Sequence, residues 1–216
     1  MPSRAMIVVG GGSSTRFGDD KLLTEAAGAP LISHTIAAVA GAADVCVVVC
    51  RPETMDRISS LHPRVVVTAG GATRTASEIA GLAALDGEPD LIGIHDAARP
   101  AVSTGMVRRL FDLAAQHGGA VPVLLSDALI LDRATHLPVP GLGMAQTPQV
   151  FRGPALLAAY AEAAETGFEG DDTVEVMERF GEVEIVTVPG DRDNIKVTYP
   201  PDLERVRALL SDPSRT

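Results

Sequence analysis

The sequence predicts an α/β protein built on a doubly wound, mainly parallel sheet, and three observations support that fold class. Short β-branched runs alternate with helical patterns along nearly the whole chain, as repeated βα units require. Hydrophobic residues make up 46% of the sequence and aromatic residues only 3%, which suits an aliphatic core with helices on both faces of the sheet. A chain of 216 residues can bury one substantial core, so we expect residues 1–216 to form a single domain.

Short runs of mainly apolar, often β-branched residues are predicted to be strands. These runs are Ala5–Val9, Asp44–Cys50, Arg64–Thr68, Leu91–His95, Ala120–Leu124 and Val183–Val188. The helices predicted between or after them span about Leu31–Val39, Thr75–Leu85, Ser103–Gly118, Pro154–Thr166, Asp172–Phe180 and Pro201–Leu210. Thr75 and Glu78 have the spacing of a capping box, which predicts that the second of these helices begins at Thr75.

Residues 126–149 interrupt the alternation of strands and helices. The segment contains Pro138, Pro140, Gly141, Gly143 and Pro148 and shows no helical pattern. It is too long for a plain connection in a compact domain. We interpret it as a β-arm that protrudes from the sheet and packs on a partner subunit, and we therefore expect a homodimer.

The charge and the apolar pattern exclude several classes of protein. A formal net charge of −10 argues against a nucleic-acid partner, which would require a basic face. The sequence contains neither a signal-like segment nor an apolar run approaching 18 residues, so we expect a cytoplasmic protein without a membrane partner. Cys46 and Cys50 lie on one predicted strand, about 13 Å apart, and we expect them to be buried and unpaired.

A glycine-rich loop follows the first predicted strand. Gly10, Gly11 and Gly12 lack a Cβ atom, so their backbone N–H groups can approach phosphate oxygens closely. Arg16 and Lys21 supply the positive charge that a polyphosphate requires. The spacing fits neither the P-loop nor the dinucleotide-binding fingerprint. The loop therefore predicts a nucleoside triphosphate site of another kind.

Three more polar clusters occur at residues 69–77, 96–100 and 191–198. Open parallel sheets bind ligands beyond the carboxyl ends of their strands, so we expect these clusters and the glycine loop to meet at one edge. The chemistry that they can share is Mg²⁺-assisted attack on a phosphate. Asp96 and Asp193 would hold the metal, while Arg16, Lys21 and Lys196 would neutralise the phosphate charge.

Five motifs occur in a specific order along the chain. They are the glycine loop with Arg16 and Lys21, Gly70-Gly71-x-x-Arg74-x-x-Ser77, His95-Asp-Ala-Ala-Arg-Pro100, Gln146-Thr-Pro-Gln149 and Asp193-Asn-Ile-Lys-Val-Thr198. Over about residues 5–210 the chain resembles the 2-C-methyl-D-erythritol 4-phosphate cytidylyltransferases of non-mevalonate isoprenoid biosynthesis, and the related ribitol-phosphate cytidylyltransferases. The resemblance implies a Rossmann-like nucleotidyltransferase fold and a transferase that joins CTP to a polyol phosphate. The products would be a CDP-polyol and pyrophosphate, with Mg²⁺ as cofactor.

The resemblance also implies which residues bind the nucleotide. The backbone of Gly10, Gly11 and Gly12 would line the CTP site. Gly71 and Ser77 would meet the cytosine and the ribose, and backbone carbonyls reading the exocyclic amine would separate CTP from UTP.

On the reaction side, the resemblance implies that Arg16 and Lys21 stabilise the α-phosphate as pyrophosphate leaves. The nucleophile would be a phosphate oxygen of the acceptor itself, so no general base is required. The residues implied at the acceptor are Asp96, Arg99, Thr147 and Lys196, with Asp96 and Asp193 near Mg²⁺.

The chain departs from the family pattern at the acceptor phosphate. Ala128 stands where the arm usually carries a threonine, and Val139 stands where it carries an arginine. Two alternatives to the methylerythritol substrate therefore stay open. The same chemistry would act on ribitol 5-phosphate, or on molybdopterin, because the first loop is also similar to that of molybdenum-cofactor nucleotidyltransferases. The other alternative is a CTP-binding paralogue with little catalysis.

Overall fold

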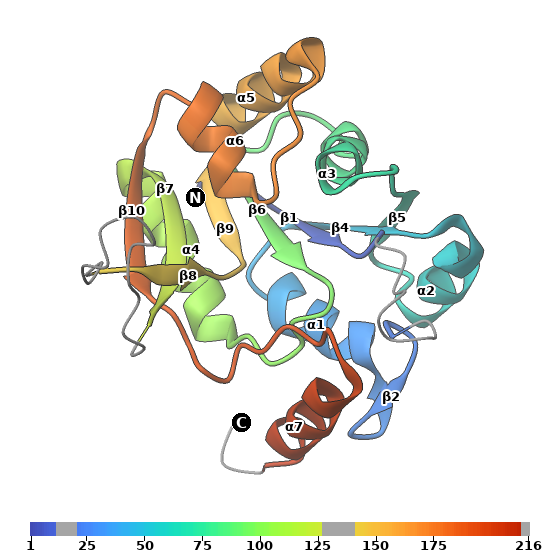
Figure 1. Cartoon of the computed structure of the whole chain (residues 1–216). Helices are drawn as coiled ribbons and strands as arrows, with labels where there is room; N and C mark the ends of the chain where they lie inside the picture. Colours follow the sequence, from blue (N-terminus) through green and yellow to red (C-terminus); the bar gives the residue numbers. More distant parts are fainter. Residues whose placement is uncertain (12–20, 127–140, 213–216) are drawn as a thin grey trace, which may run out of the picture.

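Eight strands form one central sheet in the computed structural model, which describes residues 1–11, 21–126 and 141–212 (Figure 1). The strands are β1 (Arg4–Val9), β4 (Val45–Cys50), β5 (Val66–Ala69), β6 (Leu91–Asp96), β7 (Gly118–Leu125), β8 (Gly143–Ala145), β9 (Gln149–Arg152) and β10 (Glu184–Pro189). Their order is β10-β7-β9-β6-β1-β4-β5, and β8 pairs with β7. The short β9 runs antiparallel between β6 and β7, whereas β1, β4, β5 and β6 are parallel neighbours, as are β7 and β10. The predicted α/β class with a mainly parallel sheet is confirmed.

Helices cover both faces of this sheet. They are α1 (Leu31–Ala40), α2 (Met55–Leu61), α3 (Arg74–Ala83), α4 (Thr104–His117), α5 (Gly153–Thr166), α6 (Thr173–Phe180) and α7 (Pro200–Leu210). Met6 and Val8 of β1 pack in one cluster with side chains of α1, α2, α4 and α7. Ala5 and Ile7 point to the opposite face, where they pack with α3, α5 and α6. The alternation of side chains along β1 thus separates two apolar layers.

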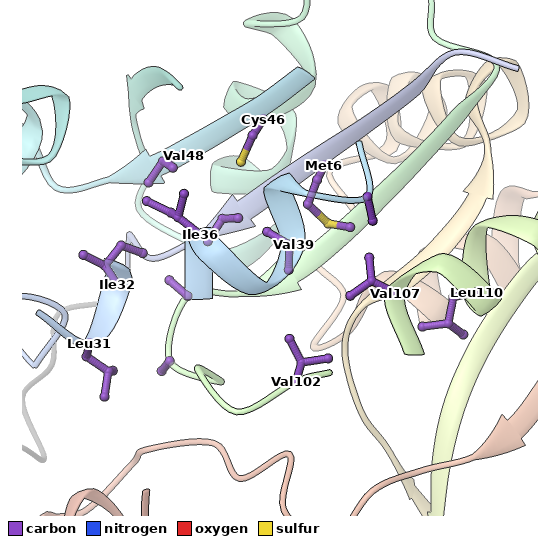
Figure 2. Close-up of a cluster of buried hydrophobic side chains, with 14 of the residues drawn as sticks. Met6, Leu31, Ile32, Ile36, Val39, Cys46, Val48, Val102, Val107 and Leu110 are labelled. Atoms are coloured by element: carbon purple, nitrogen blue, oxygen red, sulfur yellow. The ribbon is translucent and has the colours of Figure 1, made fainter. Parts of the chain in front are cut away.

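The layer beneath α1 is shown in Figure 2, where Ile32, Ile36 and Val39 point toward Met6 and Val48 of the sheet. These three helix positions recur at intervals of three and four residues, which places them on one face of the helix. Burying one such side chain stabilises the fold by about 1.5–3 kcal/mol. The periodicity that predicted the helix is therefore also what anchors it.

The start of α3 differs from the prediction. The N-cap is Thr73, whose hydroxyl accepts a hydrogen bond from the Ala76 backbone N–H at 3.0 Å. Thr75 lies inside the helix and donates to the Gly170 carbonyl, and Glu78 is fully buried. The capping box predicted from Thr75 to Glu78 is wrong, because both side chains bond to other parts of the fold.

Several short elements are absent from the sequence prediction. The short strands β2 (Glu25–Ala26) and β3 (Ala29–Pro30) form a hairpin with a two-residue turn. A 3₁₀ turn (Pro52–Thr54) precedes α2. Cys46 and Cys50 are buried and free, as expected. The longest helices of the described residues, α4 and α5, have 14 residues each, fewer than the roughly 20 that a membrane span requires, and none meets the criteria for a span.

The described base of the predicted arm is an antiparallel pair of β7 and β8, in which Leu125 lies opposite Gly143. Leu125 and Met144 are 63% and 68% exposed, and Leu142 is also exposed. Ala128 and Val139, where the chain departs from the family pattern, lie outside the described residues.

Candidate active site

A pocket of about 610 Å³ opens at the carboxyl end of the sheet. All four polar clusters singled out in the sequence contribute to its wall. The predicted site residues that line it are Gly10, Gly11, Lys21, Gly71, Ser77, Asp96 and Lys196. Gly12 and Arg16 lie outside the described residues.

The glycine loop packs closely against the loop that follows β5. A Cβ atom on Gly11 would lie 2.9 Å from Ser77 Oγ, and one on Gly71 would lie 2.5 Å from the Ala76 Cβ. Neither position has room for a larger residue. Ser77 donates to the Thr73 carbonyl at 2.8 Å and accepts from the Gly71 N–H at 3.1 Å, so its hydroxyl holds the second loop in shape. The absence of side chains leaves backbone groups to form this wall of the pocket.

Asp96 ends β6 and is only 5% exposed, yet three cations surround its carboxylate. Arg74 Nη1 lies 2.7 Å from Oδ1, while Arg99 Nε and Lys196 Nζ lie 3.2 and 3.0 Å from Oδ2. Burial raises the pKa of Asp96, but Arg74, Lys196 and Arg99 outweigh that effect and hold the pKa well below its usual range. The three cations therefore favour the ionised form of Asp96.

The only two lysines in the whole sequence, Lys21 and Lys196, both line the pocket. Lys196 reaches Asp96, and its side chain is 45% exposed. Lys21 Nζ donates to the Val197 carbonyl at 3.1 Å, which ties the end of the glycine loop to the 191–198 cluster. The two ammonium groups thus enter one pocket from opposite ends of the sequence.

Thr147 is 2% exposed, and its hydroxyl bonds to the protein rather than facing the pocket. It accepts from the Asp96 N–H at 2.9 Å and lies 3.1 Å from His95 Nδ1. His95 Nε2 lies 3.1 Å from the Arg99 carbonyl, which only accepts, so we assign the proton to Nε2 and let Thr147 donate to Nδ1. Burial lowers the pKa of His95 to about 4, which keeps the ring neutral as this chain of bonds requires.

Arg99 is also occupied within the protein. Besides Asp96, it bonds through Nη1 to the Asn194 carbonyl at 2.7 Å, while Asn194 Nδ2 donates to the Thr147 carbonyl at 2.8 Å. Gln146 donates to the Asp191 carbonyl and accepts from the Asp191 N–H. Three motifs distant in sequence are thereby joined into one hydrogen-bonded unit. In the described arrangement, Arg99 and Thr147 support the site and are not among the residues that line the pocket.

The described donor set does not fit a metal held by Asp96. Both of its oxygens already bond to cations, and Asp193 is not among the residues that line the pocket. Among the described residues there is no group of three or more His, Cys, Asp or Glu side chains that could hold a metal ion. The predicted pairing of Asp96 with Asp193 at a metal stays a prediction that this geometry does not favour.

Other residues of the pocket were not predicted as site residues. Arg51 follows β4 and lines the pocket, so the rule that ligands bind beyond strand ends would have found it. Arg74 belongs to a quoted motif but received no role. Asp171 also lines the pocket, from the loop before α6, and Gln149 accepts from the Val174 N–H at 2.9 Å near the start of that helix. Sequence spacing gives no signal for the bond between Gln149 and Val174.

Comparison with known proteins places this architecture in context. The family model "IspD: 2-C-methyl-D-erythritol 4-phosphate cytidylyltransferase" matches residues 5–212. A 2-C-methyl-D-erythritol 4-phosphate cytidylyltransferase from Cereibacter sphaeroides is 39% identical, with 96% of each chain covered. The enzyme of the same name from Solibacter usitatus is 35% identical over 86% of this chain and 82% of its own.

Solved structures agree with the sequence relatives. The crystal structure of 2-C-methyl-D-erythritol 4-phosphate cytidylyltransferase from Thermus thermophilus is similar with a TM-score of 0.81 and 28% identity. The alignment covers 98% of this chain and 100% of that one. A structure from Anaerococcus prevotii, with a TM-score of 0.86 and 23% identity over 98% and 99% of the two chains, supports the fold alone.

Proposed function

The chain belongs to the family of 2-C-methyl-D-erythritol 4-phosphate cytidylyltransferases, and we propose that the pocket beside Asp96 is its active site. The protein is a nucleotidyltransferase that joins CTP to 2-C-methyl-D-erythritol 4-phosphate and forms 4-diphosphocytidyl-2C-methyl-D-erythritol. One observation carries the assignment of the site. Both lysines of the chain enter the pocket whose wall is the glycine loop, and one of them bonds to Asp96.

The reaction requires charge stabilisation more than proton transfer. An oxygen of the acceptor phosphate attacks the α-phosphorus of CTP, and the bond between that phosphorus and the oxygen bridging to the β-phosphate breaks, releasing pyrophosphate. The acceptor phosphate is largely ionised near neutral pH, because its second pKa is about 6. The ammonium groups of Lys21 and Lys196 would stabilise the negative charge that builds on the phosphates.

The nucleotide is assigned to the glycine side of the pocket. Gly10, Gly11 and Gly71 leave backbone polar groups as the surface there, and Ser77 holds the second loop in place. Backbone donors and acceptors suit the recognition of a base edge and of phosphate oxygens. This arrangement supports CTP binding at these residues.

Mg²⁺ remains part of the proposal as an ion that accompanies the triphosphate. Phosphate oxygens are hard ligands of the kind that this ion prefers, and the bound ion would supply charge neutralisation. We assign Asp96 to positioning the side chains of Arg74, Arg99 and Lys196 and not to binding the metal, because its carboxylate oxygens already form ion pairs with these three residues.

We also propose a homodimer formed through the arm. Leu125 of β7, Met144 of β8 and Leu142, which precedes β8, are all exposed at the base of the arm. Several large apolar side chains exposed in one region of the surface are typical of an interaction site.

The test is pyrophosphate release by the purified protein with CTP, Mg²⁺ and 2-C-methyl-D-erythritol 4-phosphate. We expect release that depends on the acceptor and falls by at least about 100-fold in the Asp96→Asn variant, because two or more charge-assisted bonds are lost. CTP binding without release for this acceptor would refute the assignment of the substrate. Release unchanged by Asp96→Asn would refute the assignment of the site.

A further inference from the structure

Glu78 of α3 is a fully buried carboxylate behind the active site. It lies in the layer formed by α3, α5 and α6, which Figure 1 shows on the same side of the sheet. Removing a carboxylate from water costs several kcal/mol unless partners replace the lost solvation. The partners of Glu78 therefore decide whether it is charged and what its charge does.

Every group that bonds to Glu78 is a donor or a cation. The Tyr160 hydroxyl of α5 donates to Oε2 at 2.7 Å, and the Thr173 hydroxyl of α6 donates to Oε1 at 2.9 Å. Arg74 Nε lies 3.0 Å from Oε1, close enough for an ion pair although its N–H is not aligned for a hydrogen bond. On balance the pKa of Glu78 is raised, because burial and the nearby Asp172 carboxylate raise it more than Arg74, Tyr160 and Thr173 lower it. A site made of donors alone fits the carboxylate form.

Arg74 joins this buried group to the pocket. Its Nη1 donates to Asp96 Oδ1 at 2.7 Å, and the residue itself lines the pocket. Its Nη2 is buried without a hydrogen-bond partner among the described residues. The ion pairs that hold the guanidinium are with two carboxylates, Glu78 on one side and Asp96 on the other.

A continuous relay follows from these contacts. Tyr160 and Thr173 orient Glu78, Glu78 orients Arg74, and Arg74 orients Asp96. Asp96 in turn holds the ammonium of Lys196, the half-exposed end of the relay, in the pocket. A fixed ammonium is what phosphate chemistry requires, since a cation that moves during the reaction stabilises the transition state less.

We propose that Glu78 is a positioning residue of the cytidylyl transfer, which acts by holding Arg74 against Asp96 and thereby fixing the cations at that carboxylate. The inference rests on the proposed function for its kinetic consequence. Glu78 is not among the residues that line the pocket, so we do not assign it as a catalytic residue. It links the packing of α5 and α6 to the geometry of the active site.

The test is the Glu78→Gln variant, which keeps the shape and a hydrogen-bond acceptor but removes the charge. We expect kcat/KM for the acceptor to fall by on the order of tenfold, the effect of losing one charge-assisted contact. CTP affinity measured by calorimetry should change by less than about twofold, because Glu78 is not among the residues that line the pocket. A crystal structure of the variant should show Arg74 moved away from Asp96.

Two further variants separate positioning from loss of stability. Tyr160→Phe removes one hydrogen bond to Glu78 but keeps its charge, and should lower kcat/KM by a smaller factor, about threefold. Ala159→Gly, at the neighbouring buried position of α5, should lower stability by about 1 kcal/mol and leave kcat/KM unchanged.

The outcomes are separable. The proposal is overturned if Glu78→Gln leaves kcat/KM within twofold of the original chain, or if Arg74 stays bonded to Asp96 in the variant. A loss of activity in Ala159→Gly equal to that in Glu78→Gln would also overturn it. If the original chain does not turn over 2-C-methyl-D-erythritol 4-phosphate, the proposed function fails, and the position of Arg74 in the variant still decides the relay.

Discussion

Lowering the pH should destabilise the fold through one buried side chain, His95. The ring is 0% exposed, and burial lowers its pKa to about 4 from the ordinary 6.5. Protonation would also turn Nδ1 into a donor facing the Thr147 hydroxyl. That hydroxyl already accepts from the Asp96 N–H and would lose its own acceptor. The folded state therefore requires the neutral ring.

The sign and the size follow from proton linkage. The unfolded chain becomes protonated at His95 below about pH 6.5, whereas the folded chain binds that proton only near pH 4. The free energy of unfolding therefore decreases as the pH falls from 6.5 to 4. The shift of pKa corresponds to about 3 kcal/mol in total, all of it present above pH 6.5. Between about pH 7.5 and about pH 5, the loss from His95 is about 2 kcal/mol.

Urea unfolding at these two pH values measures the loss directly. His95→Gln removes the titrating ring, so the difference in unfolding free energy between the two pH values should shrink by about 2 kcal/mol. Burial also lowers the pKa of His62, which makes His62→Gln the matched control that should keep most of the pH dependence. Equal pH dependence in the original chain and in His95→Gln would refute the reasoning.

Three further predictions concern the site and the arm. Thr147→Val should lower the unfolding free energy by about 1–3 kcal/mol, because it leaves the Asp96 N–H without a buried acceptor. In the same urea titration, the unfolding free energy of Thr147→Ser should stay within about 1 kcal/mol of the original. Asp96→Asn should lower the unfolding free energy by about 3–5 kcal/mol, seen by calorimetry as a fall in Tm of about 10 °C, since it removes the partner of three cations. Replacing Leu125 and Met144 together by aspartate should convert the proposed dimer to a monomer in sedimentation velocity experiments, and a dimer that persists would exclude this surface as the interface.

The strands and most helices could be predicted because their patterns are local. Helix α4 begins after the predicted cap Ser103 and ends at His117, and β4 lies within one residue of its predicted span. By contrast, Gln149 was predicted to end the arm and residues 150–152 were assigned to no strand, yet Gln149–Arg152 forms a strand between β6 and β7. Four residues carry too little periodicity to identify a strand, and its partners lie far away in sequence.

The location of the site could also be predicted, since residues after parallel strands share one edge of the sheet. The direction of individual side chains could not. Thr147 lies before a proline, and the direction of its hydroxyl depends on a hydrogen bond with His95, 52 residues away. Glu78 looked like part of a cap because it lies three residues after Thr75, and only the packing of α5 and α6 shows that it meets Tyr160 and Thr173 instead.

The charge around Asp96 distinguishes two accounts of how an acidic chain binds anions. The chain carries a formal charge of −10, but distant surface charges are screened beyond about 8 Å, while the groups at the site lie within hydrogen-bonding distance of one another. If net charge alone governed binding, Asp96→Asn would make the pocket more positive and would lower the KM for the acceptor phosphate. If Asp96 instead gathers Arg74 and Lys196 at one point, the same change disperses them and raises that KM. The distances favour the second account, because a carboxylate bonded to both cations fixes where their charge is presented, and phosphate binding depends on that position as strongly as on the total charge.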